Sequence, residues 1–189
     1  HHAALYGKYD LLLHKAGNIN HYFYDEASVP NKLEPGNPNY ELAYSCVGVI
    51  DYLEGLVAAH GINAEGRTAI ETAFNMIADH EAALSERLLA YLGSRDDVTI
   101  VGDQSSDRDA RVPTISFVIA GQSSRETVEA VDPSGIGIRF GDFHSKRLVQ
   151  ALDLDDPDGV IRVSAVHYNT LDEMDRLIGQ LESLRRKVL

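Results

Sequence analysis

Residues 159–184 read GVIRVSAVHYNTLDEMDRLIGQLESL, and this stretch decides the fold. Its first part, residues 160–166, is rich in valine and isoleucine and predicts a β-strand. Thr170 and Glu173 then have the spacing of a capping box, which predicts a helix over residues 170–189. The apolar face of that helix consists of Leu171, Met174, Leu177, Ile178, Leu181 and Leu184. A strand followed at once by an amphipathic helix indicates a sheet covered by helices.

The residues upstream continue this alternation back to residue 66. An amphipathic pattern predicts a long helix over residues 66–92. Strands are expected at 98–101, 114–119 and 135–140, and short helices at 125–130 and 145–152. Residues 66–189 are therefore expected to form one compact α+β domain.

Residues 1–65 have a different character. Glycine, proline and asparagine are frequent up to residue 40, which predicts loops interrupted by short strands. A helix is expected over residues 40–53, and it is apolar nearly all round. Such a helix has to be covered on most sides. Residues 1–65 are therefore expected to belong to a larger neighbouring structure.

The composition excludes several classes of partner. The 189 residues include 29 acidic and 17 basic side chains, which gives a net charge of -12. Such a surface repels phosphate backbones, so no nucleic-acid partner is expected. No apolar run approaches the roughly 20 residues of a membrane span, so no membrane partner is expected. The one cysteine, Cys46, excludes an internal disulfide framework and favours a cytoplasmic location.

Generic motifs of catalysis and metal binding are missing. No cluster of cysteines and histidines has the spacing of a zinc site, so no metal site is expected. Gly135 and Gly137 precede an expected strand instead of linking a strand to a helix, which excludes a dinucleotide-binding fingerprint. Cys46 lies among apolar residues of the expected helix, where a small buried hydrophobic side chain is favoured over a nucleophile.

The loop at residues 32–39, KLEPGNPN, has two explanations. It is either a rigid loop with Asn39 as the N-cap of the next helix, or a loop whose backbone N–H groups and Asn amide receive an anion. The residue types alone leave both open.

Two arginines also have two explanations. Arg139 ends an expected strand, and Arg162 lies in another strand between Ile161 and Val163. A guanidinium in an apolar strand has to be paired, because an unpaired buried charge is very costly. Its partner is either an internal Asp or Glu or the carboxylate of a ligand, which arginine grips bidentately. Chemistry alone does not choose between them.

Taken in order, four segments resemble the C-terminal half of the class V aminotransferases, the fold type I pyridoxal-phosphate (PLP) enzymes that include the cysteine desulfurases. HAALYGK at 2–8 is similar to the strand that follows the family's cofactor lysine. LEPGNPN at 33–39 resembles the family's E-x-G-T-P-N loop, and GIGIRFG at 135–141 resembles its G-I-x-V-R-x-G strand. Residues 159–173 resemble its G-x-x-R-x-S-x-x-x-Y-N-T-x-x-E pattern. Together the segments span nearly the whole chain.

The resemblance implies a fold between the α/β and α+β classes. Residues 1–65 would form the end of the large PLP-binding domain, and residues 66–189 the small C-terminal α+β domain. It also implies a cytoplasmic enzyme with PLP as its cofactor, which acts on an amino acid through an external aldimine.

The resemblance also implies roles for single residues. Arg162 would bind the carboxylate of the amino-acid substrate, with Arg139 as a second cationic contact. Gly36 and Asn37 would contact the PLP phosphate of the neighbouring subunit in a homodimer.

The chain departs from the family's pattern at three points. The cofactor lysine falls upstream of His1, so the chain is expected to lack it, to need the N-terminal remainder of the enzyme and to be inactive alone. Asn37 replaces the family's threonine. His144 takes the place of the desulfurases' nucleophilic cysteine, and it is either an active-site acid or base or a surface histidine. The alternative to an enzyme is a non-catalytic, free-standing α+β domain that binds or assembles partners.

Overall fold

The computed structural model describes residues 2–19, 22–34, 36–154 and 158–188. The chain divides into two compact units, residues 1–73 and 74–189, with the boundary inside the long helix α3 (Gly66–Gly93). The assignment of residues 1–65 to the end of a large domain and of residues 66–189 to a small domain stays a prediction.

The first unit is helical in its described part. It contains α1 (Tyr9–His14), the 3₁₀ turn η1 (Asn31–Leu33), α2 (Tyr40–Ala59) and the start of α3. None of its described residues forms a strand, so the short strands expected before residue 40 are wrong there. Lys32 is almost fully buried, and its Nζ donates to the carbonyl oxygens of Leu13 at 3.4 Å and Ala16 at 3.1 Å. This lysine ties η1 to the end of α1.

Helix α2 begins where the sequence predicts and continues beyond the expected end at residue 53. Asn39 is its N-cap, because the Asn39 side chain accepts a hydrogen bond of 2.8 Å from the backbone N–H of Leu42. Within residues 40–59 only Leu53 and Val57 are buried. Its exposed large apolar side chains are Tyr40, Tyr44, Val47, Val49, Ile50 and Tyr52. The helix thus presents most of its apolar surface uncovered by this chain.

By length and composition α2 could cross a membrane. It has 20 residues and a mean hydropathy of 1.4 over its most apolar 18-residue window, and it is the one such helix in the described parts of the chain. The expectation that no apolar run approaches this length is therefore wrong. Core helices of soluble proteins meet the same criterion, so length and composition alone do not assign α2 to a membrane.

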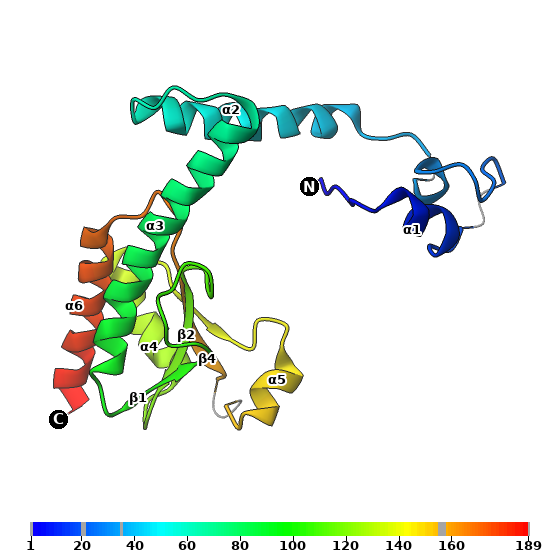
Figure 1. Ribbon diagram of the computed structural model, residues 1–189. Helices are drawn as coiled ribbons and strands as arrows, with labels where there is room; N and C mark the ends of the chain where they lie inside the picture. Colours follow the sequence, from blue (N-terminus) through cyan, green and yellow to red (C-terminus); the bar gives the residue numbers. More distant parts are fainter. Residues whose placement is uncertain (1, 20–21, 35, 155–157, 189) are drawn as a thin grey trace. The chain divides into compact units, whose positions relative to one another are not determined.

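The second unit is a four-stranded antiparallel sheet with helices (Figure 1). After α3 come β1 (Val98–Val101), β2 (Thr114–Ile119), α4 (Ser124–Val131), the 3₁₀ turn η2 (Asp132–Ser134), β3 (Arg139–Gly141), α5 (Lys146–Ala151), β4 (Val160–Ser164) and α6 (Leu171–Val188). The strand order is β1-β2-β4-β3, and each neighbouring pair is antiparallel. The expected mixture of helices and sheet in this part of the chain is confirmed.

The core lies between one face of the sheet and helices α3, α4 and α6. The strands contribute Ile115, Phe117, Ile119, Ile161 and Val163, and the helices contribute Leu84, Leu88, Leu92, Val128, Val131, Leu177 and Leu181. Helices α3 and α6 lie side by side (Figure 1) and are joined at the surface by the ion pair of Arg87 with Asp175. The sheet is therefore covered on one face by a helical layer.

The capping box predicted at the start of α6 is confirmed. The backbone N–H of Thr170 donates to Glu173 Oε2 at 2.8 Å, and the backbone N–H of Glu173 donates to Thr170 Oγ1 at 3.2 Å. The bond from the Thr170 backbone lowers the pKa of Glu173 from its ordinary value. This box ends the loop after β4 and starts the helix at Leu171.

Strand β3 is shorter than the sequence predicts. Residues 135–138 do not pair with β4, and pairing begins only at Arg139. Beyond β4, Ala165 donates its N–H to the carbonyl oxygen of Pro113, on the side of β2. The backbone of residues 136–138 therefore has no partner strand, although Ile138 is buried in the core.

Two glycines allow β3 and β4 to meet closely. Gly159, just before β4, has a φ of 75°, and a Cβ placed on it would lie 2.6 Å from the carbonyl carbon and oxygen of Gly141. A side chain at residue 159 would thus be both strained and in collision with backbone atoms. This approach sets where β3 ends and where the loop after it begins.

We predict that Gly159→Ala lowers the free energy of unfolding by at least about 2 kcal/mol, because the left-handed backbone alone costs roughly 1–2 kcal/mol. Gly179→Ala is the matched control, since Gly179 lies in α6 with open space around it and alanine favours a helix by roughly 0.5–1 kcal/mol. Thermal unfolding of both variants checks this. Equal melting temperatures for the two variants would contradict the close approach.

Candidate functional site

The two arginines singled out from the sequence lie opposite each other on neighbouring strands. Arg139 of β3 is the cross-strand partner of Arg162 of β4, and Ser116 of β2 faces Arg162 from the other side. Ile161 and Val163 are buried in the core, so alternation along the strand puts Arg162 on the face away from the helical layer. Arg162 is half-buried and Arg139 is exposed.

Neither guanidinium forms an ion pair with an acidic side chain of the described residues. The ion pairs found there involve Arg67, Arg87, Arg95, Arg108, Arg125 and Arg185. Arg139 donates to the adjacent carbonyl oxygen of Ile138 at 2.8 Å. Like charges directly opposite in a sheet destabilise it. The internal Asp or Glu partner, one of the two explanations that the sequence left open, does not occur within the described part of the chain.

An aromatic ring that the sequence analysis missed holds Arg162 instead. The Cζ atom of Arg162 lies 3.7 Å from the centroid of the Phe143 ring, a cation–π contact. Phe143 belongs to the turn Asp142–Ser145, which the Ser145 N–H closes by donating to the Asp142 carbonyl oxygen at 2.8 Å. In the sequence, this contact is signalled by an aromatic residue shortly after a strand that ends in arginine. That pattern is too common to identify Phe143.

The same turn carries His144. Phe143 and His144 have φ values of 51° and 64°, in the left-handed region that non-glycine residues rarely adopt. The His144 backbone N–H donates to Asp142 Oδ1 at 2.9 Å, and the residue is exposed. The structure thus brings His144 into the loop that also carries the partner ring of Arg162.

The predicted phosphate loop lies in the first unit. Gly36 has a φ of 94°, and Gly36 and Asn37 are both exposed, while Pro35 lies outside the described residues. The backbone N–H groups of Gly36 and Asn37 donate to no acceptor in the described parts of the chain. The Asn39 side chain caps helix α2. This agrees with the explanation of residues 32–39 as a rigid loop that ends in an N-cap. The donors at residues 36 and 37 are still available to an anion.

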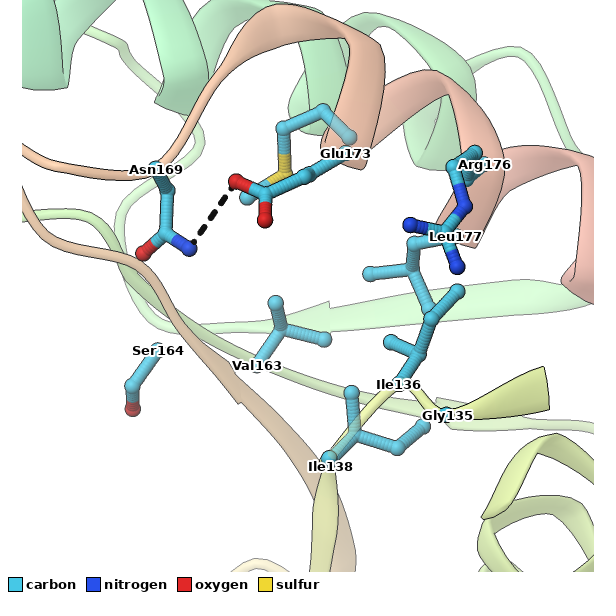
Figure 2. Close-up of a pocket in the computed structure, with 11 residues that line it drawn as sticks. Gly135, Ile136, Ile138, Val163, Ser164, Asn169, Glu173, Arg176 and Leu177 are labelled. Atoms are coloured by element: carbon cyan, nitrogen blue, oxygen red, sulfur yellow. Dashed lines mark hydrogen bonds between the residues drawn. The ribbon is translucent and has the colours of Figure 1, made fainter. Parts of the chain in front are cut away.

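A pocket lies next to the point where β3 and β4 stop pairing (Figure 2). Its volume is about 210 Å³, and Val163 and Ser164 line it opposite Glu173 and Arg176 of α6. Figure 2 shows the Asn169 amide bonded to Glu173, at 3.2 Å. Arg176 donates to the carbonyl oxygen of Ser134 at 3.3 Å. The polar groups of the pocket are therefore largely engaged with one another and with backbone.

The structure places Cys46 differently from the prediction. The side chain is exposed on α2, and its thiol lies 3.7 Å from the carbonyl oxygen of Leu42. The expectation that Cys46 is a buried hydrophobic residue is wrong for this chain, because the surface of α2 that carries it is uncovered. No group of three or more His, Cys, Asp or Glu side chains that could hold a metal occurs in the part of the chain that the structure describes.

Comparison with known proteins identifies the family. The sequence model described as "Aminotransferase class-V" matches residues 4–177. The chain is 41% identical over 167 residues to "Aminotransferase-like protein FGM3" of Gibberella zeae, covering 87% of this chain and 38% of that protein. It is 30% identical to "Cysteine desulfurase-like protein ustD" of Aspergillus flavus, covering 88% of this chain and 35% of that protein.

Solved structures show the same fold. The cysteine desulfurase CsdA of Escherichia coli matches with a TM-score of 0.65 at 20% identity, covering 94% of this chain and 41% of that one. A cysteine desulfurase of Thermococcus onnurineus matches with a TM-score of 0.64 at 21% identity, covering 82% and 33%. The chain spans little more than a third of the length of the two curated relatives named above. The family resemblance read from the sequence motifs is confirmed: the chain belongs to the class V aminotransferase family.

Proposed function

We propose that this chain is the C-terminal part of a PLP-dependent enzyme and that Arg162 and Arg139 bind the carboxylate of its amino-acid substrate. The observation that carries the proposal is the pair of arginines opposite each other without a carboxylate partner in the described residues. The substrate class is an amino acid because the family acts on amino acids.

The electrostatics of the pair favour an anionic ligand. Arg139 and Arg162 are cross-strand partners, and like charges in such positions repel each other. Neither guanidinium forms an ion pair with a described acidic residue. A carboxylate between them neutralises the repulsion and accepts two parallel hydrogen bonds from the planar fork of Arg162. Arg162 then fixes the orientation of the substrate, and the more exposed Arg139 adds a second positive charge.

The residues of the first unit fit a contact with the PLP phosphate. Gly36 and Asn37 offer backbone N–H groups without acceptors in the described residues, and Gly36 leaves room for an oxyanion to approach. PLP supplies the electron sink for chemistry at the amino acid, while the protein supplies orientation and proton transfer. We propose that Gly36 and Asn37 serve the phosphate bound by the other subunit of a homodimer.

The remaining parts of the proposal concern partners and location. The uncovered apolar surface of α2 is proposed to pack against protein, either the N-terminal remainder of the enzyme or a second subunit, in a cytoplasmic enzyme.

His144 puts an imidazole in the same turn as Phe143, where it can accept or donate a proton. If it is instead a surface histidine, His144→Ala leaves turnover unchanged.

We predict that Arg162→Ala in the full-length enzyme weakens amino-acid binding by about thirtyfold or more, because a desolvated charge pair contributes roughly 2–5 kcal/mol. The absorbance of bound PLP should stay unchanged, since Arg162 is not proposed to hold the cofactor. Arg87→Ala is the control, because Arg87 forms an exposed ion pair with Asp175. Titration with the amino acid checks this, and unchanged affinity in Arg162→Ala would show that Arg162 does not bind the carboxylate.

We predict that the cofactor lysine does not lie within residues 1–189. The lysines of the chain are Lys8, Lys15, Lys32, Lys146 and Lys187. The 189-residue chain, mixed with PLP and reduced with borohydride, should be labelled weakly and without preference at the exposed lysines and least at buried Lys32. Peptide mapping by mass spectrometry measures the label. Stoichiometric labelling of one lysine would place the covalent centre within this chain.

The third prediction concerns sulfur chemistry. Cys46 is the one thiol of the chain, and the position after the R-x-G element that carries the desulfurases' nucleophile holds His144, which cannot store sulfur. The full-length enzyme should therefore release sulfide from L-cysteine slowly, and Cys46→Ala should not change that rate. Sulfide assays with a reductant present, on the wild type and on Cys46→Ala and His144→Ala, check this. Rapid release that Cys46→Ala abolishes would make the exposed thiol a nucleophile.

A further inference from the structure

We propose that Phe143 is a positioning residue that holds the guanidinium plane of Arg162 for the substrate carboxylate. The proposal rests on the proposed function of Arg162 and extends it to a residue that touches Arg162 and not the substrate. It is carried by the stacking geometry of the two side chains and by the backbone of the turn that presents the ring.

The ring contacts the face of the guanidinium and leaves its edge available. A guanidinium carries its five N–H donors in its own plane. At 3.7 Å from Cζ to the ring centroid there is no room for an N–H to point at the ring, so the ring lies over the face of that plane. No hydrogen bond from the Arg162 guanidinium to a described residue is formed. The stacking thus fixes the plane of Arg162 without using the donors that a carboxylate needs.

Two arginines of the same unit, Arg87 and Arg95, are held by internal carboxylates. Arg95 donates to both carboxylate oxygens of Asp97, at 2.9 and 2.5 Å, and Arg87 donates to both oxygens of Asp175, at 2.5 and 3.0 Å. Their forks are engaged with an internal carboxylate. The Phe143 ring covers the face of the Arg162 guanidinium. The N–H groups at the edge of that guanidinium bond to no described residue. That contrast is expected of a group kept for an external carboxylate.

The backbone of the turn is strained in the place that presents the ring. Phe143 and His144 are consecutive non-glycine residues at positive φ, a conformation that persists only where the surroundings enforce it. The two hydrogen bonds to Asp142, from the backbone N–H groups of His144 and Ser145, close this turn. Gly141, at a φ of 130°, leads into it directly from β3. The turn therefore carries Phe143 back over the sheet face to Arg162.

The loss of the ring should act on the carboxylate and on nothing else in the substrate. Without Phe143 the Arg162 side chain is free to rotate. The entropy cost of ordering this side chain is then added to the free energy of binding. We expect Phe143→Leu to weaken binding of a carboxylate ligand about five- to thirtyfold, which corresponds to about 1–2 kcal/mol. Phe143→Tyr keeps the aromatic face and should bind as the wild type does.

The experiment compares two probes on the full-length, PLP-loaded enzyme. L-Alanine carries the carboxylate, and L-alaninamide replaces it by a neutral amide. Dissociation constants of both are measured by calorimetry for the wild type, Phe143→Leu, Phe143→Tyr, Arg162→Ala and the double variant Phe143→Leu/Arg162→Ala. Thermal unfolding of each variant is measured alongside.

The proposal expects the preference for L-alanine over L-alaninamide to fall in Phe143→Leu and to persist in Phe143→Tyr. It also expects the double variant to be no worse than Arg162→Ala, because Phe143 acts through Arg162. A lower melting temperature of Phe143→Leu with an unchanged preference would make the ring merely structural and overturn the proposal. If Arg162→Ala itself leaves the preference unchanged, the proposed function of Arg162 fails, and the role of Phe143 fails with it. If Arg162→Ala removes the preference and Phe143→Leu does not, only the positioning role is lost.

Discussion

Strand β4 has to bury Ile161 and Val163 in the core, and the candidate site depends on that constraint. Side chains alternate across a strand, so burial of these two residues puts Arg162 on the opposite face, away from helices α3, α4 and α6. The register with β3 then places Arg139 directly across from it. A shift of one residue would send Arg162 into the core and both apolar residues into solvent. The apolar packing of the domain therefore determines where its cationic pair lies.

Arg139 and Arg162 are cross-strand partners in an acidic protein, and neither forms an ion pair with a described residue. The chain carries 29 acidic and 17 basic side chains, and six arginines of the described residues pair with carboxylates. Arg162 contacts an aromatic ring instead. A charge that an acidic protein leaves without an internal partner is a candidate for binding an external anion. The proposed function takes the carboxylate of an amino acid as that anion.

The two units differ in how well they cover their own apolar surface. The second unit surrounds a core of buried strand and helix residues, whereas α2 of the first buries only Leu53 and Val57. The chain spans little more than a third of the curated relatives named above. Cys46 lies on the uncovered surface of α2, which is why the prediction of its burial was wrong.

The sequence by itself determined the family and most of the elements. The bounds of β1 and β2 and the capping box at Thr170 and Glu173 depend on local patterns, because strand alternation and caps involve residues close together in the chain. It also singled out Arg139 and Arg162, since a charge among apolar strand residues is visible in one dimension. The tertiary structure alone decided that the two face each other, that β3 begins only at Arg139 and that Phe143 covers Arg162. These features depend on strand register, on the close approach of Gly159 to Gly141 and on two residues at positive φ. Each is a relation between residues that folding brings together, and no local pattern encodes it.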